Sequence, residues 1–290
     1  MANYFELGAS LYTPATNFKL QRHIENGLSG ARSMVICTED AVAEEELESS
    51  LVKLEAALSG AVISKKIARF IRPRNPEVLA RILKMEGVNK VDGFVLPKCD
   101  FESMPAFLSV LSQYATKRFG LMPTLESVFM CQPAQIQQFR CLLEGVAEHD
   151  IVCIRIGGND LFNELGLKRM PETTIYETPI RSLIDNIVTG FRPHGFEVAA
   201  PVFDYSDDRA TLKRELKTDV AYGFFAKTAI HPNQVPVIEE YINRYVVEHH
   251  DIAASLKEES RAVYLASGQM MEKTCHSNWA ERTLMLANAR

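Results

Sequence analysis

The chain lacks the features by which secreted, disulfide-bonded and membrane-spanning proteins are recognised. Its cysteines stand singly without CxxC spacing, which argues against a disulfide framework or a zinc knuckle. The six are Cys37, Cys99, Cys131, Cys141, Cys153 and Cys275. The first residues form neither a basic nor an apolar segment, and no apolar run approaches the roughly 18 residues of a membrane span. We therefore expect a cytoplasmic protein with reduced cysteines.

Positive charge is in short supply. The 290 residues include 32 Lys and Arg against 37 Asp and Glu, which gives a net charge of −5. A protein that binds nucleic acid or an anionic membrane surface would be expected to carry a basic excess. We expect neither partner, and a small anionic substrate would have to be held by a local basic group.

Short apolar runs alternate with helical patterns along most of the chain, which is typical of a parallel sheet with crossover helices. Eight runs are predicted as strands: residues 7–12, 33–37, 67–71, 93–96, 120–124, 151–156, 197–200 and 220–225. The clearest helical patterns cover residues 78–85, 106–117, 135–147, 175–190 and 210–217. Eight βα units in a chain of this length predict an α/β fold, a TIM (β/α)₈ barrel over residues 1–235.

The pattern changes after Pro236. Residues 238–247, 253–268 and 279–289 show helical periodicity with no strand predicted between them, so residues 236–290 are expected to form additional C-terminal helices. These helices could cover one end of their own barrel or pack on a neighbouring subunit. Trp279 and the pair Met270 and Met271 favour an interface, because aromatic and Met residues are enriched there.

Two carboxylates follow neighbouring strands of the predicted barrel. Glu126 follows the run 120–124, and Asp160 follows the run 151–156. Because strand ends meet on one rim of a barrel, the two side chains should lie together, and hard oxygen ligands suit Mg²⁺, with Mn²⁺ also possible. Either residue could instead stabilise a helix N-terminus. Gly157 and Gly158 favour a ligand site, because they let a ligand approach backbone N–H groups.

Other charged residues are predicted on the same rim. Glu39 and Asp40 follow the second strand, Arg72 the third and Lys98 the fourth. His231 could act as a base, but Ile-His-Pro also makes a rigid helix entry, which we favour. We find no reason to assign Lys98 a Schiff-base role.

Five motifs in order resemble the citrate lyase β-subunit-like branch of the HpcH/HpaI aldolase superfamily. They are Glu-Asp-Ala-Val at 39–42, Gly-Phe-Val-Leu-Pro-Lys at 93–98, Leu-Glu-Ser at 125–127, Gly-Asn-Asp-Leu at 158–161 and Ala-Ile-His-Pro-Asn-Gln at 229–234. The resemblance implies a TIM barrel that cleaves or forms carbon–carbon bonds of citrate-like or malyl-like acids. It also implies a homo-oligomer, a trimer or a hexamer.

The resemblance assigns roles to individual residues. Glu126 and Asp160 match the direct Mg²⁺ ligands, while Glu39 and Asp40 match an acidic pair that reaches the metal through water. Arg72 matches the arginine that grips the carboxylate or enolate oxygen of the substrate. We expect three further residues to help bind that substrate: Gly158, Asn159 and Lys98.

The chain also departs from its relatives. The helix after the acidic pair usually bears basic residues, whereas residues 42–50 include Glu44, Glu45, Glu46 and Glu48, which makes a coenzyme A thioester doubtful. The expected reaction is a retro-aldol or retro-Claisen cleavage, or the reverse condensation, of a 2-oxo or 2-hydroxy carboxylic acid through a metal-stabilised enolate. The general acid or base is Glu39, Asp40, a metal-bound water, or Glu272 or His276 from a neighbour. A phosphoenolpyruvate or pyruvate-enolate enzyme and a non-catalytic barrel scaffold in a multiprotein assembly remain as alternatives.

Overall fold

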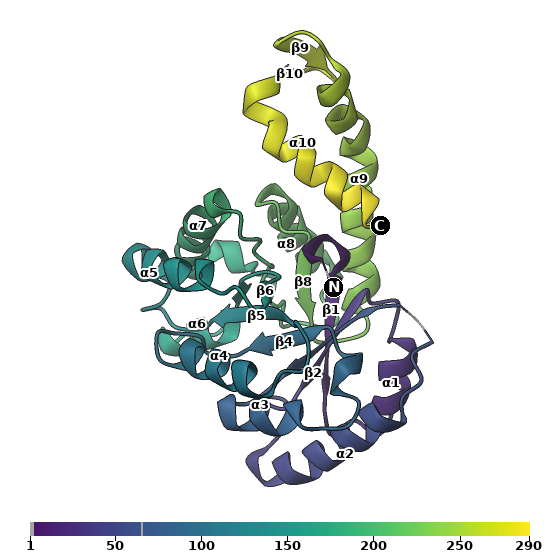
Figure 1. The fold of residues 1–290 in the computed structure, drawn as a ribbon. Helices are drawn as coiled ribbons and strands as arrows, with labels where there is room; N and C mark the ends of the chain where they lie inside the picture. The colour runs from purple at the N-terminus through teal and green to yellow at the C-terminus, as the bar shows by residue number, and fades with distance from the viewer. Residues whose placement is uncertain (1–2, 65) are drawn as a thin grey trace.

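The computed structural model describes residues 3–64 and 66–290, and its centre is a curled parallel sheet (Figure 1). The sheet order is β6-β5-β4-β3-β2-β1-β8, and β7 pairs with β5. The strands are β1 Gly8–Pro14, β2 Ser33–Cys37, β3 Ala68–Arg72, β4 Gly93–Leu96, β5 Gly120–Leu125, β6 Asp150–Ile151, β7 Arg155–Ile156 and β8 Ala226–Ala229.

Two parallel bridges connect the ends of this sheet. Ile154, between β6 and β7, pairs with Val198, and Ala200 pairs with Lys227 in β8. The donor–acceptor distances of the supporting backbone hydrogen bonds include 2.8 Å from Ile154 N to Glu197 O and 2.8 Å from Ala200 N to Ala226 O. The predicted strand at residues 197–200 is therefore present as a bridging segment, and the predicted barrel fold is confirmed.

One predicted strand is wrong. Residues 220–225 were expected to form the eighth strand, but Val220 and Ala221 end helix α8 (Arg209–Ala221), and β8 begins only at Ala226. Gly223, with a φ of +71°, follows the helix and redirects the chain. The apolar run misled the prediction because it includes the buried end of the helix as well as the approach to the strand.

Helices pack around the sheet (Figure 1). Their starts agree with local sequence signals: Asn75 accepts a hydrogen bond from Val78 N at 2.9 Å before α3, and Asp208 accepts one from Thr211 N at 2.9 Å before α8. The remaining helices that precede the C-terminal segment are α1 Leu20–Asn26, α2 Leu47–Gly60, α3 Pro76–Leu83, α4 Ser103–Tyr114, α5 Pro133–Glu144, α6 Gly158–Glu164 and α7 Ile180–Phe191.

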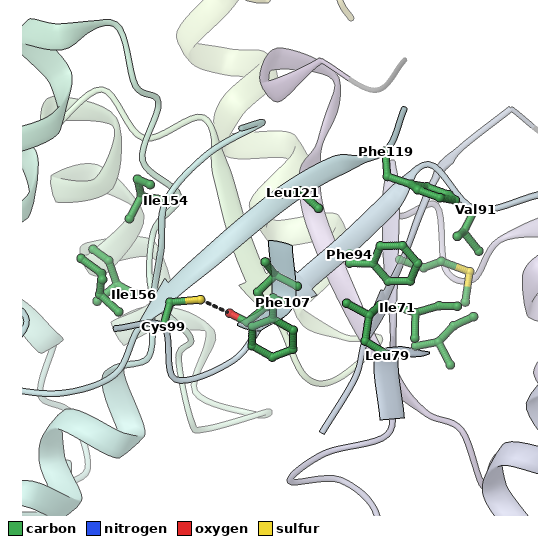
Figure 2. Close-up of a cluster of buried hydrophobic side chains, with 14 of the residues drawn as sticks. Ile71, Leu79, Val91, Phe94, Cys99, Phe107, Phe119, Leu121, Ile154 and Ile156 are labelled. Carbon is green, nitrogen blue, oxygen red and sulfur yellow. Dashed lines mark hydrogen bonds between the residues drawn. The ribbon is translucent and has the colours of Figure 1, made fainter. Parts of the chain in front are cut away.

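Strand residues alternate between two buried layers. Ile71, Phe94 and Leu121 pack with helix residues such as Leu79 and Phe107 in the cluster that Figure 2 shows. Their neighbours on the strands, among them Val35, Phe70, Val95 and Met122, belong to a second cluster. The two-residue period of a strand places this second set inside the barrel. By the same alternation, inward-facing side chains nearer the ends of the strands point into the mouth of the barrel.

The C-terminal segment differs from the prediction. A single long helix, α9 (Gln234–Glu258), is followed by an antiparallel hairpin of β9 (Val263–Ala266) and β10 (Gln269–Glu272), and then by α10 (Lys273–Asn288). The expectation of helices without strands is therefore wrong. Ser267 and Gly268 have φ values of +48° and +79°, so they make the tight turn of the hairpin.

The C-terminal arm, residues 234–290, begins with α9, which packs beside β8, β1 and α8, and its last helix, α10, reaches the end of the barrel from which the strands start. Arg282 in α10 binds Glu197, which directly precedes the bridging segment, with Nη2 2.7 Å from Oε2. Arg32, just before β2, donates to the carbonyl of Ala289. The hairpin projects beyond the barrel (Figure 1). The hairpin and α10 therefore lie away from the rim on which the strands end.

Within the described ranges, no helix is long and apolar enough to cross a membrane.

Candidate active site

A cavity of about 280 Å³ opens where the strands of the barrel end. Side chains that continue the inward-facing series of the strands line this cavity. Arg72 lies two residues after the inward-facing Phe70, and Thr124 lies two residues after the inward-facing Met122. The wall is formed by Tyr12, Cys37, Asp40, Ala41, Arg72, Thr124, Glu126, Arg155, Ile156, Gly157, Gly158, Asn159, Asp160, Val202, Thr228 and Ile230. Predicted site residues from four separate strands thus meet at one place.

Arg72 is the centre of a dense ion-pair network. Its Nη2 lies 2.9 Å from Glu39 Oε2 and 2.8 Å from Glu126 Oε1, and its Nη1 lies 3.2 Å from Asp40 Oδ2. The carboxylates around the guanidinium, above all that of Glu126, outweigh burial and raise the pKa of Arg72. The residue is therefore a permanent cation at the mouth of the barrel.

Lys98 closes the network on the side of β4. Its Nζ lies 2.6 Å from Glu39 Oε1, and its backbone N donates to Glu126 Oε2 at 2.8 Å. A φ of +48° turns the backbone of this residue toward the carboxylate. The side chain is exposed and paired with acids, which gives no support to a Schiff-base lysine.

Glu126 and Asp160 lie beside each other, as the sequence predicts. Both line the main cavity and a neighbouring cavity of about 260 Å³. Gly157 makes room for Glu126, because a Cβ at this position would lie 2.2 Å from Cγ of that residue. Burial, with the charge of Asp160 adding to it, raises the pKa of Glu126 to about 7. Burial and the charge of Asp40 also raise the pKa of Asp160.

Glu39 and Asp40 have opposite environments. Burial raises the pKa of Glu39, and its hydrogen bond with Asp40 acts in the same direction. For Asp40, the hydrogen bond with Glu39 and the charges of Arg72 and Lys98 outweigh burial and lower the pKa. Neighbouring carboxyl groups whose pKa values are pushed apart can hold a proton on one partner and negative charge on the other.

The donor set fits a magnesium ion better than a zinc ion. In the part of the chain that the structure describes, no three His, Cys, Asp or Glu side chains converge as a ready-made metal cage. Mg²⁺ needs no such cage, since it is commonly held by one or two carboxylates together with waters and substrate oxygens. The carboxylates here outnumber the cations, so the excess negative charge suits a divalent ion: Glu39, Asp40, Glu126 and Asp160 stand against Arg72, Lys98 and Arg155.

The other predicted site residues take different positions. Gly158 and Asn159 line the cavity at the start of α6, with Gly158 buried and Asn159 exposed. His231 is exposed and does not line the cavity, and its backbone N donates to Gln234 Oε1 at 3.3 Å, in keeping with a helix entry. Glu272 and His276 lie in the C-terminal arm, where Nδ1 of His276 is 3.0 Å from Glu272 N.

Among the cavity residues that the sequence analysis missed are Tyr12, Arg155 and Thr228. Arg155 had a visible signal, because it is the one charged residue in the apolar run 151–156. Thr228 and Tyr12 had none, since a polar residue in a strand is ordinary.

Comparison with known proteins agrees with this geometry. The family model described as "C-C_Bond_Lyase of the TIM-Barrel fold" matches residues 1–289. CitE from Mycobacterium tuberculosis, solved with magnesium, acetoacetate and coenzyme A, has a TM-score of 0.68 over 97% of this chain and 98% of that chain, at 19% identity. Malate synthase from Haloferax volcanii has a TM-score of 0.69 over 99% and 89%, at 13% identity.

RipC from Yersinia pestis has a TM-score of 0.62 over 83% of this chain and 96% of that chain, at 20% identity. The comparison with curated proteins finds no match. At these identities the solved structures show a shared fold, and the expected resemblance to the citrate lyase β-subunit-like proteins is confirmed. Because the family model spans nearly all of the sequence, the chain belongs to the family of carbon–carbon bond lyases with the TIM-barrel fold.

Proposed function

We propose that the protein is a Mg²⁺-dependent lyase that cleaves or forms a carbon–carbon bond in a small 2-oxo or 2-hydroxy carboxylic acid. The observation that carries the proposal is the excess of negative charge at the strand ends. There, Glu126 and Asp160 line one cavity with Arg72. Among the described residues, no cation lies within ion-pair distance of Asp160. A barrel that served only as a scaffold would have no use for this arrangement, because uncompensated carboxylates in a cavity are costly.

The residues divide the chemistry among them. Cleavage sends the electron pair of the broken bond into the carbonyl-bearing fragment, so negative charge grows on an oxygen. Glu126 and Asp160 would hold a Mg²⁺ ion, which would supply a Lewis acid for that charge, and Mn²⁺ could replace it. Arg72 adds a preorganised guanidinium that can grip a carboxylate or enolate oxygen through two N–H groups. Its partner Asp40 has a side chain that is 54% exposed, so a substrate carboxylate can displace it.

Proton transfer falls to the pair Glu39 and Asp40. Cleavage of an acid whose hydroxyl group is β to a carbonyl or carboxyl carbon requires a base for the hydroxyl proton, and the fragment that receives the electron pair requires an acid. The raised pKa of Glu39 suits it to hold a proton, and the lowered pKa of Asp40 keeps it ionised, so that it is free to act as the base.

The substrate is expected to be a free acid. The citrate lyase β-subunit of M. tuberculosis was solved with oxaloacetate and magnesium, which supports a small carboxylate here. The related CitE complex also contains coenzyme A. In this chain, however, Glu44, Glu45 and Glu46 are exposed just after the acidic pair of the site, where they would repel the phosphates of that cofactor.

A substrate screen tests the proposal. Short 2-oxo and 2-hydroxy acids are incubated with wild-type protein and Mg²⁺, and products are detected by mass spectrometry. We expect turnover of at least one acid that stops when the metal is removed by chelation and is restored by Mg²⁺ or Mn²⁺. Asp160→Asn is the matched inactive control. Metal-independent turnover, or equal turnover by the variant, would contradict the proposal.

We also propose that the chain forms a homo-oligomer, a trimer or a hexamer, in which the C-terminal arm meets a neighbour's site. The hairpin and α10 of the arm lie away from the cavity of their own barrel, so they do not cover it. Leu265 and Met270 in the hairpin are exposed. Trp279 favours packing of the arm within its own chain, because its Nε1 donates to Tyr245 Oη of the same chain at 2.9 Å. Light scattering decides: a monomer, or an assembly unchanged by Leu265→Glu with Met270→Glu, excludes the shared site.

A further inference from the structure

One wall of the cavity holds a buried cation that the proposed mechanism leaves unused. Arg155 in β7 is only 2% exposed, yet it lines the cavity together with Glu126 and Asp160. The two-residue alternation of the strand turns it inward, two positions after Cys153 of the inner layer. Its guanidinium therefore faces the space in which a ligand would lie.

The contacts of Arg155 are all with neutral groups. Its Nη2 donates to Thr228 Oγ1 at 2.5 Å, and its Nη1 lies 3.5 Å from Met122 Sδ, a weak acceptor. The guanidinium carbon lies 5.5 Å from the centre of the Tyr12 ring. No acidic side chain among residues 3–64 and 66–290 comes within 4.0 Å of it.

Two other buried arginines of the molecule have acidic partners. Arg72 has three carboxylates, and Arg169 pairs with Glu215 at 2.8 Å and with Asp204 at 3.0 Å. Arginine is almost never buried unless it is paired, since removing its charge from water is costly. The lack of a counter-ion at Arg155, in a cavity wall, indicates that its counter-ion comes from a ligand.

The wall of the cavity therefore carries charge of both signs. Around Glu126 and Asp160 there is room for a divalent cation, and around Arg155 and Thr228 there is room for an anion. A single guanidinium with a planar fork of N–H groups matches one carboxylate, which carries one negative charge and two oxygens. A phosphate would bring more charge than this end of the cavity compensates.

We propose that Arg155, oriented by Thr228, binds a second carboxylate of the substrate, so that the substrate class is a dicarboxylic acid. This inference rests on the proposed function, because it assumes that the 2-oxo or 2-hydroxy end of the acid lies at Glu126, Asp160 and Arg72. Arg155 then sets specificity, since a monoacid of equal length leaves the buried cation without its counter-ion.

Matched pairs of acids test the inference by calorimetry in saturating Mg²⁺. Malate is compared with 2-hydroxybutanoate, and 2-oxoglutarate with 2-oxopentanoate, so that a methyl group replaces only the distal carboxylate. We expect wild-type protein to bind the diacid of at least one pair about tenfold more tightly or better, in line with the range of charge-assisted hydrogen bonds. In Arg155→Met this ratio should fall to about 1, and Arg155→Lys should retain part of it.

Folding and stability provide an independent readout. In the absence of ligand, Arg155→Met should have an equal or higher Tm than wild type, because it removes a buried charge that has no partner. Arg169→Met, the control, should have a lower Tm. A fall in Tm for Arg155→Met as large as that for Arg169→Met would mean that Arg155 is structural, and would contradict the inference.

Two sets of results separate this inference from the proposed function. If Mg²⁺-dependent binding of 2-oxo acids is seen but wild type does not distinguish diacids from monoacids, the inference fails alone. If the diacid preference depends on Arg155 but neither Mg²⁺ removal nor Glu126→Gln affects binding, the proposed function fails and the carboxylate site stands. Binding of phosphoenolpyruvate that is lost in Arg155→Met, without any diacid preference, would assign the guanidinium to a phosphate and overturn the inference.

Discussion

The molecule contains two buried clusters of charge that look alike in sequence and differ in function. One surrounds Arg72 at the strand ends. The other surrounds Lys227, a residue of β8 that is 1% exposed and faces α8. The ammonium group of Lys227 has three partners: Nζ donates to Pro201 O and to Glu215 Oε1, both at 2.9 Å, and forms an ion pair with Asp219 Oδ2 at 2.9 Å. Lys227 does not line the active-site cavity.

The clusters differ in whether each charged group has an ion-pair partner within the protein. In the Lys227 cluster, Arg169 holds the other oxygen of Glu215 at 2.8 Å, and Tyr176 donates to Asp219 at 2.5 Å. In the Arg72 cluster, Asp160 lines the cavity and lacks an ion-pair partner among the described residues. A closed network stabilises a fold, whereas an unbalanced network that lines a cavity is available for a ligand.

Removing the cation of the closed network should have the largest effect on stability. Lys227→Met leaves Glu215 and Asp219 without their shared partner, so the free energy of unfolding should fall by about 3–5 kcal/mol. Urea unfolding measures this change. The Mg²⁺ affinity of the fraction that remains folded should be unchanged, and a loss of metal binding in folded protein would show that the two clusters are coupled.

Arg72→Lys should separate substrate binding from metal binding. Lysine keeps the positive charge but loses the planar fork, so turnover of an accepted acid should fall roughly 100-fold. Mg²⁺ affinity, measured by calorimetry, should change by less than about threefold, because Glu126 and Asp160 are intact. Arg169→Lys is the control in the closed network. Unchanged turnover in Arg72→Lys would reduce Arg72 to a structural partner of Glu126.

The raised pKa of Glu126 predicts a smaller effect, with a defined sign. The metal requires the carboxylate, so Mg²⁺ should bind about tenfold more tightly at pH 8 than at pH 6, on either side of the pKa of about 7. Stability of the metal-free protein should move the other way. Because the folded pKa lies above the value of 4.5 expected in the unfolded chain, the contribution of Glu126 to stability is lost as pH rises through 7.

Glu126→Gln is the control for both pH effects, because it cannot titrate. Asp219, whose pKa burial raises to about 6, acts on stability in the same direction in both proteins. The difference between wild type and Glu126→Gln therefore isolates Glu126. An identical pH dependence of stability in the two would show that this carboxyl group has an ordinary pKa.

The barrel was readable from sequence because its signals are local. The strands at Ser33–Cys37 and Gly93–Leu96 were predicted with the bounds that the structure has, since each is a short apolar run beside polar turns. The eighth strand was misplaced, because an apolar run does not say where a helix ends. The β9–β10 hairpin was missed although Ser267-Gly268 is a turn signal, since helical periodicity was given more weight than turn chemistry.

The site was only partly readable, because charge pairing is a property of three-dimensional contacts. Sequence placed Glu126, Asp160 and Arg72 on one rim, and the structure brings all three to one cavity. It could not show that Lys227 would point outward to α8 while its neighbour Thr228 points into the cavity. Nor could it show that Arg155 would be buried without an acid, since partners distant in sequence decide that.

The central claim is that the unbalanced cluster binds a divalent metal and the closed one does not. Calorimetric titration with Mg²⁺ of wild type, Glu126→Gln, Asp160→Asn and Asp219→Asn tests it most directly. Even outer-sphere changes cost 10–100-fold in metal affinity, so loss of a direct ligand should weaken binding by more than about 100-fold in the first two variants. Asp219→Asn should bind as wild type does. Equal Mg²⁺ affinity in all four proteins would contradict the account.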